Sequence, residues 1–143
     1  MKLVIQRVKK ASVKVNGKIV SQIGPGLVLL VAVEDRDRDR LGEIAEKILK
    51  MRIFENNEKK FDKSILDING EILVVPQFTL FADCSKGNRP YFGQAAKPEI
   101  AKPIFEKFLE ELKKSGLKVE SGIFRAKMEV KLINDGPVTI VLS

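Results

Sequence analysis

Leu27-Val28-Leu29-Leu30-Val31-Ala32-Val33 is an almost wholly apolar run that begins directly after the turn residues Gly24-Pro25-Gly26. The run is far shorter than the roughly 18 residues of a membrane-spanning helix. A short apolar run that follows a turn is typical of a strand buried on both faces. The segment therefore predicts a strand that the rest of the chain covers from two sides.

The residues before this run predict an antiparallel hairpin. Leu3 to Val8 has the composition of a first strand, and Ser12 to Val15 alternates polar and apolar residues. Asn16-Gly17 is the strongest short-range hairpin signal, because both residues tolerate the positive φ of a two-residue turn. The chain is then expected to return through Ile19 to Ile23.

Two helices are predicted further along the chain. The first has apolar residues at helical spacing, with aspartates before them that are expected to cap it: Leu41, Ile44, Ala45, Ile48 and Leu49. The second begins at Pro98 or Pro103 and stops at Gly116. Its apolar face comprises Ile100, Ile104, Phe105, Phe108, Leu109 and Leu112.

The remaining segments are expected to be strands, over 72–81 with an interruption at Pro76, and over 117–124, 127–133 and 138–142. With 143 residues, one domain is the default. The sequence therefore predicts one compact α+β domain spanning 1–143, with a largely antiparallel sheet or barrel and two main helices.

Composition excludes several classes of site. The chain has no histidine and one cysteine, Cys84. A Ser–His–Asp triad, a histidine-ligated metal and a cysteine-rich zinc site are therefore impossible, and we expect no metal and no cofactor. The lone cysteine and the absence of a signal peptide before Met1-Lys2-Leu3 predict a cytoplasmic protein. The net charge of +7 fits a nucleic-acid partner, or solubility alone.

Two local anomalies are candidates for a site. Pro76 cannot donate to a strand ladder, so it predicts an edge or bulge that leaves the Gln77, Phe78 and Thr79 amides partly unpaired. Free amides beside a hydroxyl suit the oxyanion of acyl transfer. Gly136-Pro137 interrupts a strand pattern and is a candidate cis peptide. The ordinary alternatives are a strand with Thr79 present for β-propensity and a tight turn at 136–137.

Seven segments together resemble the D-aminoacyl-tRNA deacylase family from the first strand to the last. They are Gln6-Arg7-Val8, Ala11-Ser12-Val13, Ile23-Gly24 with Gly26-Leu27, Arg52-Ile53-Phe54, Gln77-Phe78-Thr79-Leu80, Lys86-Gly87 with Arg89-Pro90, and Asn134 to Thr139. The resemblance implies a metal-free homodimer that hydrolyses the ester joining a D-amino acid to the terminal adenosine of tRNA. It also implies action on glycine mischarged on tRNA-Ala.

The resemblance also implies roles for individual residues. Gly136 and Pro137 are similar to a Gly–cisPro segment that enters the partner's pocket and reads chirality with backbone atoms. Arg7 resembles the residue that supports this segment. Phe124 and Met128 are similar to pocket residues near the adenosine.

Two mechanisms remain open for the catalytic segment Gln77, Phe78 and Thr79. Thr79 acts as a nucleophile, or the ribose 2′-hydroxyl helps to activate water while amides near Gln77 and Phe78 stabilise the oxyanion. The second is preferred, because no histidine is present to activate a threonine hydroxyl.

The chain departs from the family pattern at several positions: Pro76 replaces the usual serine, Arg125 a common glycine, Tyr91 a common serine, and Phe61-Asp62 a typical Met-Asn pair. Two other functions stay in view. A non-enzymatic tRNA-binding module would bind tRNA and release no amino acid. A Thr-dependent hydrolase of small esters would act without tRNA.

Overall fold

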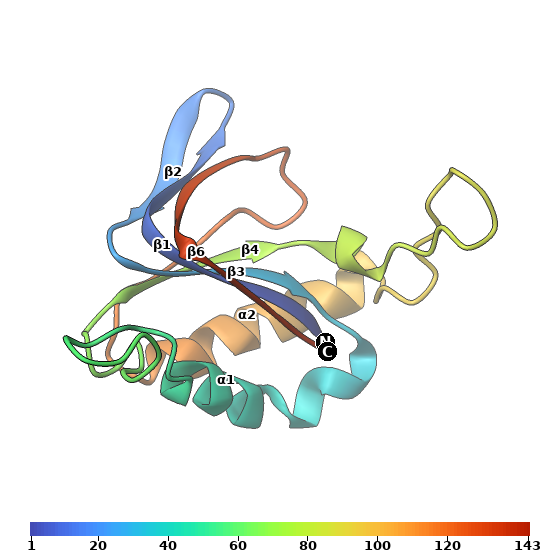
Figure 1. Cartoon of the computed structure of the whole chain (residues 1–143). Helices are drawn as coiled ribbons and strands as arrows, with labels where there is room; N and C mark the ends of the chain where they lie inside the picture. Colours follow the sequence, from blue (N-terminus) through green and yellow to red (C-terminus); the bar gives the residue numbers. More distant parts are fainter.

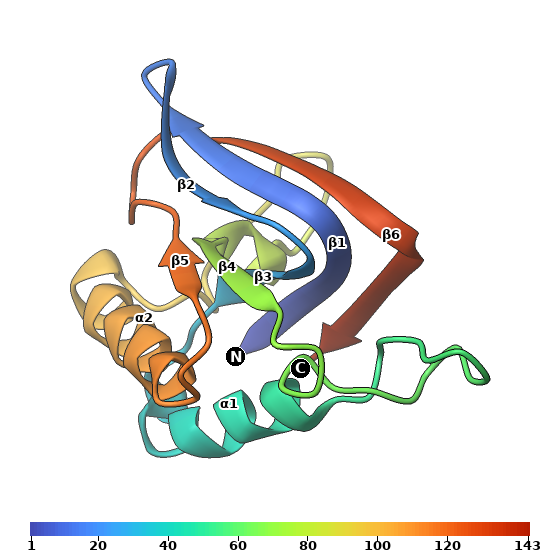
Figure 2. The same cartoon turned by 90° about the vertical axis from the view of Figure 1, so that its left-hand side faces the viewer.

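The two longest strands, β1 (Lys2–Val15) and β6 (Glu129–Leu142), run antiparallel beside each other and organise the fold (Figure 1). The computed structural model describes all residues, 1–143. Its sheet has six strands in the order β2-β1-β3-β4-β5, with β6 paired to β1. Figure 2 shows that this sheet curls strongly, with α1 and α2 below and beside it. The α+β class and the two helices are thus confirmed.

The predicted hairpin is present. β2 (Lys18–Ile23) returns antiparallel to the second half of β1. Asn16 and Gly17 form the turn with φ of 51° and 75°, the left-handed conformation that a type I′ turn needs. The first half of β1 pairs instead with β3 (Gly26–Ala32), the apolar run, whose residues are almost all buried.

The sheet is mixed rather than uniformly antiparallel. β4 (Glu71–Pro76) runs parallel to β3, and β5 (Val119–Ser121) runs parallel to β4. Parallel neighbours need a long crossover, and the chain places α1 before β4 and α2 before β5. At Gly26 a side chain would collide with the backbone of Glu71, so glycine permits the close approach of β3 and β4.

Both helices cover one side of the sheet. α1 spans Leu41–Lys50 and α2 spans Pro98–Lys113, with Pro98 in its first turn and Pro103 inside it. Their apolar faces meet the strands in the main core, in which Phe108, Ile48 and Leu29 are fully buried. No helix is long and apolar enough to cross a membrane.

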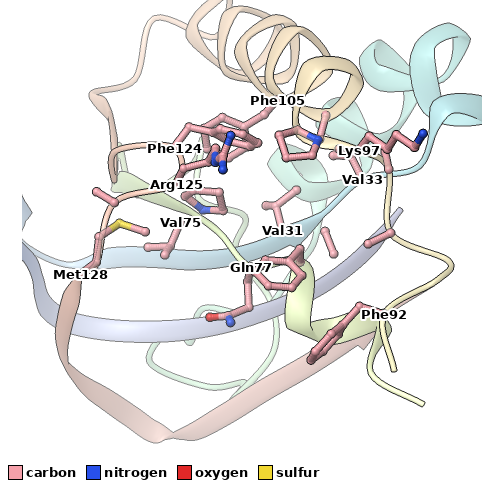
Figure 3. A pocket seen from close by; sticks show the side chains of 18 of the residues that line it. Val31, Val33, Val75, Gln77, Phe92, Lys97, Phe105, Phe124, Arg125 and Met128 are labelled. Carbon is pink, nitrogen blue, oxygen red and sulfur yellow. The ribbon is translucent and has the colours of Figure 1, made fainter. Parts of the chain in front are cut away.

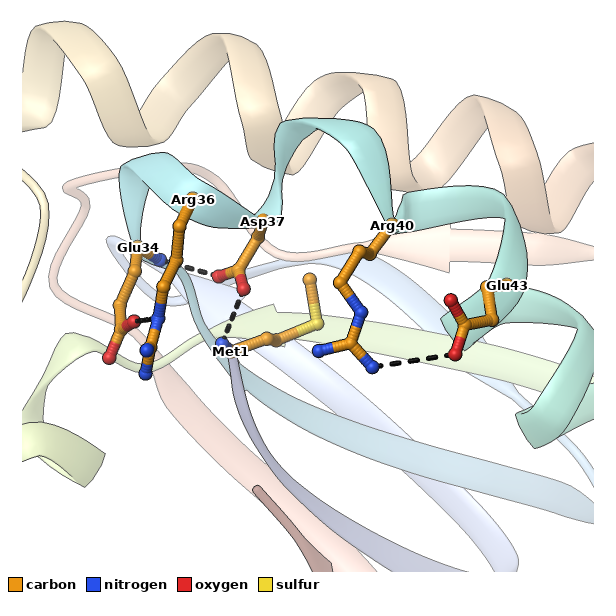
Figure 4. Close-up of polar contacts among 6 residues, drawn as sticks. All are labelled: Met1, Glu34, Arg36, Asp37, Arg40 and Glu43. Atoms are coloured by element: carbon orange, nitrogen blue, oxygen red, sulfur yellow. Dashed lines mark hydrogen bonds and ion pairs between the residues drawn. The ribbon is translucent and has the colours of Figure 1, made fainter.

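The aspartates before α1 do not cap it, which corrects the prediction. They lie in the 3-10 helix η1 (Asp35–Asp39), and α1 begins after Arg40 without a side-chain cap. Asp37 is buried and accepts hydrogen bonds from the Glu34 amide and the Met1 ammonium group, both at 2.6 Å (Figure 4). The aspartate therefore holds the chain terminus against η1.

Four predicted strands have different bounds. β4 ends at Pro76, and the chain turns into the 3-10 helix η2 (Phe78–Phe81), because proline cannot continue the ladder. The strand predicted over 117–124 is shorter in the structure, where β5 spans only Val119–Ser121. The strands predicted over 127–133 and 138–142 form one strand, β6, whose pairing with β1 skips 135–138 around Gly136–Pro137 and continues on both sides.

Candidate functional site

A cavity of about 650 Å³ opens where β4 ends, beside the start of α2 (Figure 3). Its volume lies within the usual range of small-molecule sites, about 300–1,000 Å³. Fourteen of its nineteen lining residues are hydrophobic, so it suits an aromatic or apolar group. Four segments supply most of the lining: 31–33 in and after β3, 75–78 at the end of β4, 95–105 before and in α2, and 124–130 before and in β6.

The end of β4 presents two free amides beside this cavity. Pro76 pairs with Val31 of β3, and the Gln77 amide donates to the Val31 carbonyl at 2.8 Å. The Gln77 amide is therefore not available, contrary to the prediction. The Phe78 and Thr79 amides have no partner in the chain, because they are the first two residues of η2 and precede its first hydrogen bond, from the Leu80 amide to the Gln77 carbonyl.

Gln77 and Thr79 are in contact, although they do not share a strand. The Gln77 Nε2 group donates to the Thr79 Oγ1 atom. No lysine or carboxylate hydrogen-bonds to that hydroxyl, so no base is in place to activate it as a nucleophile. Thr79 is exposed and lies next to the cavity lining, which includes Gln77 and Phe78.

Four aromatic side chains line the cavity in two pairs. Phe78 is 59% exposed and meets Phe92 edge-to-face, with ring centroids 5.1 Å apart. Phe124 packs near Phe105 of α2, with ring centroids 6.1 Å apart (Figure 3). Such rings offer faces and edges on which a base can stack.

Phe124 and Met128 line the cavity as well. Neither residue lies in a strand, because β5 ends at Ser121 and β6 begins at Glu129. Their positions are therefore set by the connecting turn, and strand burial does not explain them. Met128 packs its sulfur over Gly122, where a Cβ would lie only 2.6 Å from Sδ.

A protruding hairpin adjoins the aromatic opening. Asp83 and Tyr91 exchange two backbone hydrogen bonds of 2.8 and 2.9 Å at its base. Two hydrogen bonds from Ser85 hold the pKa of Asp83 below its ordinary value. The bond from the Ser85 side chain has the larger effect, and the bond from its backbone amide the smaller. The fixed base directs the exposed residues 84–90 away from the main body (Figure 1).

Gly136 and Pro137 lie elsewhere. Their peptide bond is cis, as predicted, and both residues are exposed. They lie where β6 loses its pairing with β1 between Asn134 and Thr139, the corner of this strand; Figure 2 shows β6 bending sharply on the side of the sheet opposite α2, and neither residue lines the cavity. Asn134 spans the corner: its Oδ1 accepts from the Val138 amide at 2.7 Å, and its Nδ2 donates to the Val138 carbonyl at 3.2 Å.

Arg7 holds this corner from β1. The residue is 7% exposed, its Nε donates to the Asp135 carbonyl at 3.0 Å and its Nη1 donates to the Ile53 carbonyl at 2.8 Å. The guanidinium thus connects the corner to the segment after α1. The guanidinium is planar and rigid, so the bond to Ile53 fixes the orientation in which it binds the carbonyl of Asp135, the residue before Gly136.

Sequence reasoning missed part of the cavity wall. Phe105 comes from the apolar face of α2, where its spacing is the same as that of core residues such as Phe108. Lys97 and Arg125 line the cavity as its two basic residues, and no acidic residue lines it. Only the proximity of 97 and 125 to the end of β4 in space distinguishes them from other surface charges.

Comparisons with known proteins agree with this architecture. A profile of the family described as D-Tyr-tRNA(Tyr) deacylase matches residues 4–143. A D-aminoacyl-tRNA deacylase from Carboxydothermus hydrogenoformans is 51% identical over 99% of both chains. The corresponding protein from Dictyoglomus turgidum is 53% identical and covers 99% of this chain and 92% of its own.

Two solved structures have the same fold. A c-Myc DNA Unwinding Element Binding Protein has a TM-score of 0.92 and 42% identity, covering 100% of this chain and 98% of its own. A probable eukaryotic D-amino acid tRNA deacylase has a TM-score of 0.85 at 20% identity, covering 99% and 97%. The second likeness concerns the fold alone.

Proposed function

The chain belongs to the D-Tyr-tRNA(Tyr) deacylase family and is a D-aminoacyl-tRNA deacylase, and we propose that its cavity binds the 3′-terminal aminoacyl-adenosine of the tRNA. The proposal is carried by one observation: free amides of Phe78 and Thr79 adjoin an apolar cavity with aromatic edges. Phe124 and Met128 contact the adenosine in this proposal, and Phe78 borders the reacting ester.

Chirality is read by a second copy of the chain. No acidic residue lines the cavity, so the α-ammonium group of the substrate has no carboxylate there. Backbone carbonyls are the alternative acceptors, and the exposed Gly136–Pro137 corner offers carbonyls next to the Asp135 carbonyl that Arg7 holds in place. Because this corner lies away from its own cavity, it has to enter the cavity of a partner. Each copy then gives and receives one corner, which a two-fold homodimer satisfies.

A rigid corner explains selectivity by exclusion. Carbonyls that hold the ammonium group leave one side of the α-carbon open for a D side chain or the hydrogen of glycine. The same backbone blocks the side on which an L side chain would lie. One pocket thus accepts many D-amino acids and glycine mischarged on tRNA-Ala, and rejects L-amino acids by steric conflict.

Hydrolysis needs water to add to the ester carbonyl and the ribose oxygen to leave. The free Phe78 and Thr79 amides stabilise the negative charge that develops on the carbonyl oxygen. The neighbouring 2′-hydroxyl of the ribose helps to orient the water and returns a proton to the leaving oxygen. Gln77 positions the Thr79 hydroxyl, which serves binding rather than attack.

Hydrolysis of D-Tyr-tRNA and L-Tyr-tRNA, measured side by side as released tyrosine, tests the proposal. We expect rapid release from the D ester and release at the uncatalysed rate from the L ester. Equal rates for both esters would overturn the chiral role of the site. We expect the enzyme to act in the cytoplasm, where tRNAs are charged.

A further inference from the structure

Arg125 has a left-handed backbone conformation that is uncommon for arginine. It lies between Phe124 and Ala126 in the turn before β6, with φ of 66°. This left-handed conformation is uncommon for residues other than glycine, asparagine and aspartate. Glycine would adopt it freely, so an arginine here has to gain something through its side chain.

The side chain of Arg125 forms no polar contact within the protein. Arg125 is exposed and, like Arg89 in the protruding hairpin, makes no hydrogen bond or ion pair with any residue, whereas the other five arginines are paired: Arg7, Arg36, Arg38, Arg40 and Arg52. All five of its N–H donors are therefore free. Figure 3 shows the guanidinium group beside Phe124, at the side of the cavity nearest α2.

The surroundings of Arg125 favour an anion. The cavity is lined by two charged residues, Arg125 and Lys97, and both are basic. Figure 3 shows that the Lys97 amino group points away from the cavity, which leaves Arg125 as the cation beside the pocket residues. A planar guanidinium matches the paired oxygens of a phosphodiester or a carboxylate.

We propose that Arg125 binds the phosphodiester adjoining the terminal adenosine and so positions the RNA end over the cavity. This inference rests on the proposed function. If the adenosine contacts Phe124 and Met128, its 5′ phosphate has to leave the cavity across the segment that joins them, which contains Arg125. A carboxylate of a D-aspartyl or D-glutamyl substrate has the same chemistry, and the experiment distinguishes the two sources.

The test compares three variants with the wild-type homodimer. Arg125→Gly removes the charge and suits the backbone, so we expect it to fold and melt as the wild type does. Arg125→Lys keeps the charge without the fork. Lys47→Ala is the control, because Lys47 is an exposed basic residue of α1 that lies outside the cavity.

For D-Tyr-tRNA in dilute salt, Arg125→Gly should raise KM about tenfold, as loss of one hydrogen-bonded charge predicts. The value of kcat should stay within about twofold. Affinity is also measured for an RNA that ends in CCA and carries no amino acid. The slope of log affinity against log salt concentration should become smaller in magnitude by about 0.7, the contribution of one single-strand phosphate. For Arg125→Lys, KM and the slope should lie between the values of the wild type and of Arg125→Gly. Lys47→Ala should change neither KM nor the slope.

The same measurements on D-Asp-tRNA identify the anion. An equal rise of KM for both substrates supports the phosphate contact, whereas a rise confined to D-Asp-tRNA would overturn it in favour of the side-chain carboxylate. An unchanged KM and an unchanged salt slope in Arg125→Gly would also overturn it. Failure of the wild type to prefer D esters is a separate result, because it contradicts the proposed function and leaves RNA binding measurable.

Discussion

Replacing Gly136 by alanine introduces one methyl group at the corner that we place in the partner's cavity. A Cβ at this position would lie 2.9 Å from Cγ2 of Val138 and 3.0 Å from Nη2 of Arg7. Both distances are shorter than ordinary van der Waals contact, and the φ of 133° is disfavoured for an L residue. The guanidinium of Arg7 therefore has to shift away from the Asp135 carbonyl that it binds.

The expected loss of stability is modest. A residue held in a sparsely populated backbone region costs about 1–3 kcal/mol. For a chain of this size, that lowers the melting temperature by roughly 3–10 °C. The variant should remain folded and should keep the dimeric state that we propose, which circular dichroism and light scattering measure directly.

The expected loss of activity is much larger. A displacement of about 1 Å at a reacting centre lowers rates by about 10²-fold, and here the methyl group also occupies the space above the α-carbon. We expect deacylation of D-Tyr-tRNA to fall at least that far, measured as released tyrosine in single-turnover conditions.

Gly116→Ala is the matched control. Gly116 also has a positive φ, 82°, but it lies after α2, and nothing lies within 4 Å of the added Cβ. This variant should lose stability and keep its activity. A Gly136→Ala enzyme with normal rate and D selectivity would refute the role that we give to the corner.

Three further predictions concern Arg7, Thr79 and Asp37. Arg7→Ala removes the two hydrogen bonds that fix Asp135 and Ile53, so unfolding free energy should fall by about 2–4 kcal/mol in urea titrations, and the ratio of D-Tyr to L-Tyr release should fall with it. Thr79→Ala should slow single-turnover deacylation by less than about 10³-fold, because the hydroxyl has no base beside it, and a trapped acyl group on Thr79 would contradict this mechanism. Asp37→Ala leaves the part-buried Met1 ammonium group without its partner, and should lower the free energy of unfolding by about 1–3 kcal/mol; an unchanged denaturation midpoint would show that the pair contributes nothing.

Local patterns predicted much of this fold. The apolar run at 27–33, the Asn16-Gly17 turn and the helical spacing of Leu41 to Leu49 each determine structure within a few residues, and each was confirmed. The bounds of β4 and β6 were harder to predict. Proline ended β4, whereas at 136–137 the bonds from Asn134 and the long pairing with β1 carried the strand through.

The site was only partly predictable, because its residues meet across the chain. Gln77 and Phe78 stood out through Pro76, but the Gln77 amide is paired with Val31, a contact that depends on parallel pairing of β3 and β4. Arg125 had one sequence signal of its conformation, the glycine that the family commonly has at this position. Its positive φ becomes visible only in the turn that joins β5 to β6.

The central claim is that each cavity is completed by the Gly136–Pro137 corner of the other subunit. Mixed dimers test it most directly, using Gly136→Ala together with Ala126→Trp, which fills the cavity that Ala126 lines. Each variant alone should be inactive on D-Tyr-tRNA.

In a mixed dimer, the open cavity of the Gly136→Ala subunit faces the intact corner of the Ala126→Trp subunit. When the two are refolded together at equal concentration, random pairing should restore about one quarter of the wild-type D-Tyr-tRNA deacylation, since half of the dimers are mixed and each has one working site. No recovery of activity, with mixed dimers present by mass, would contradict completion of the site across the interface.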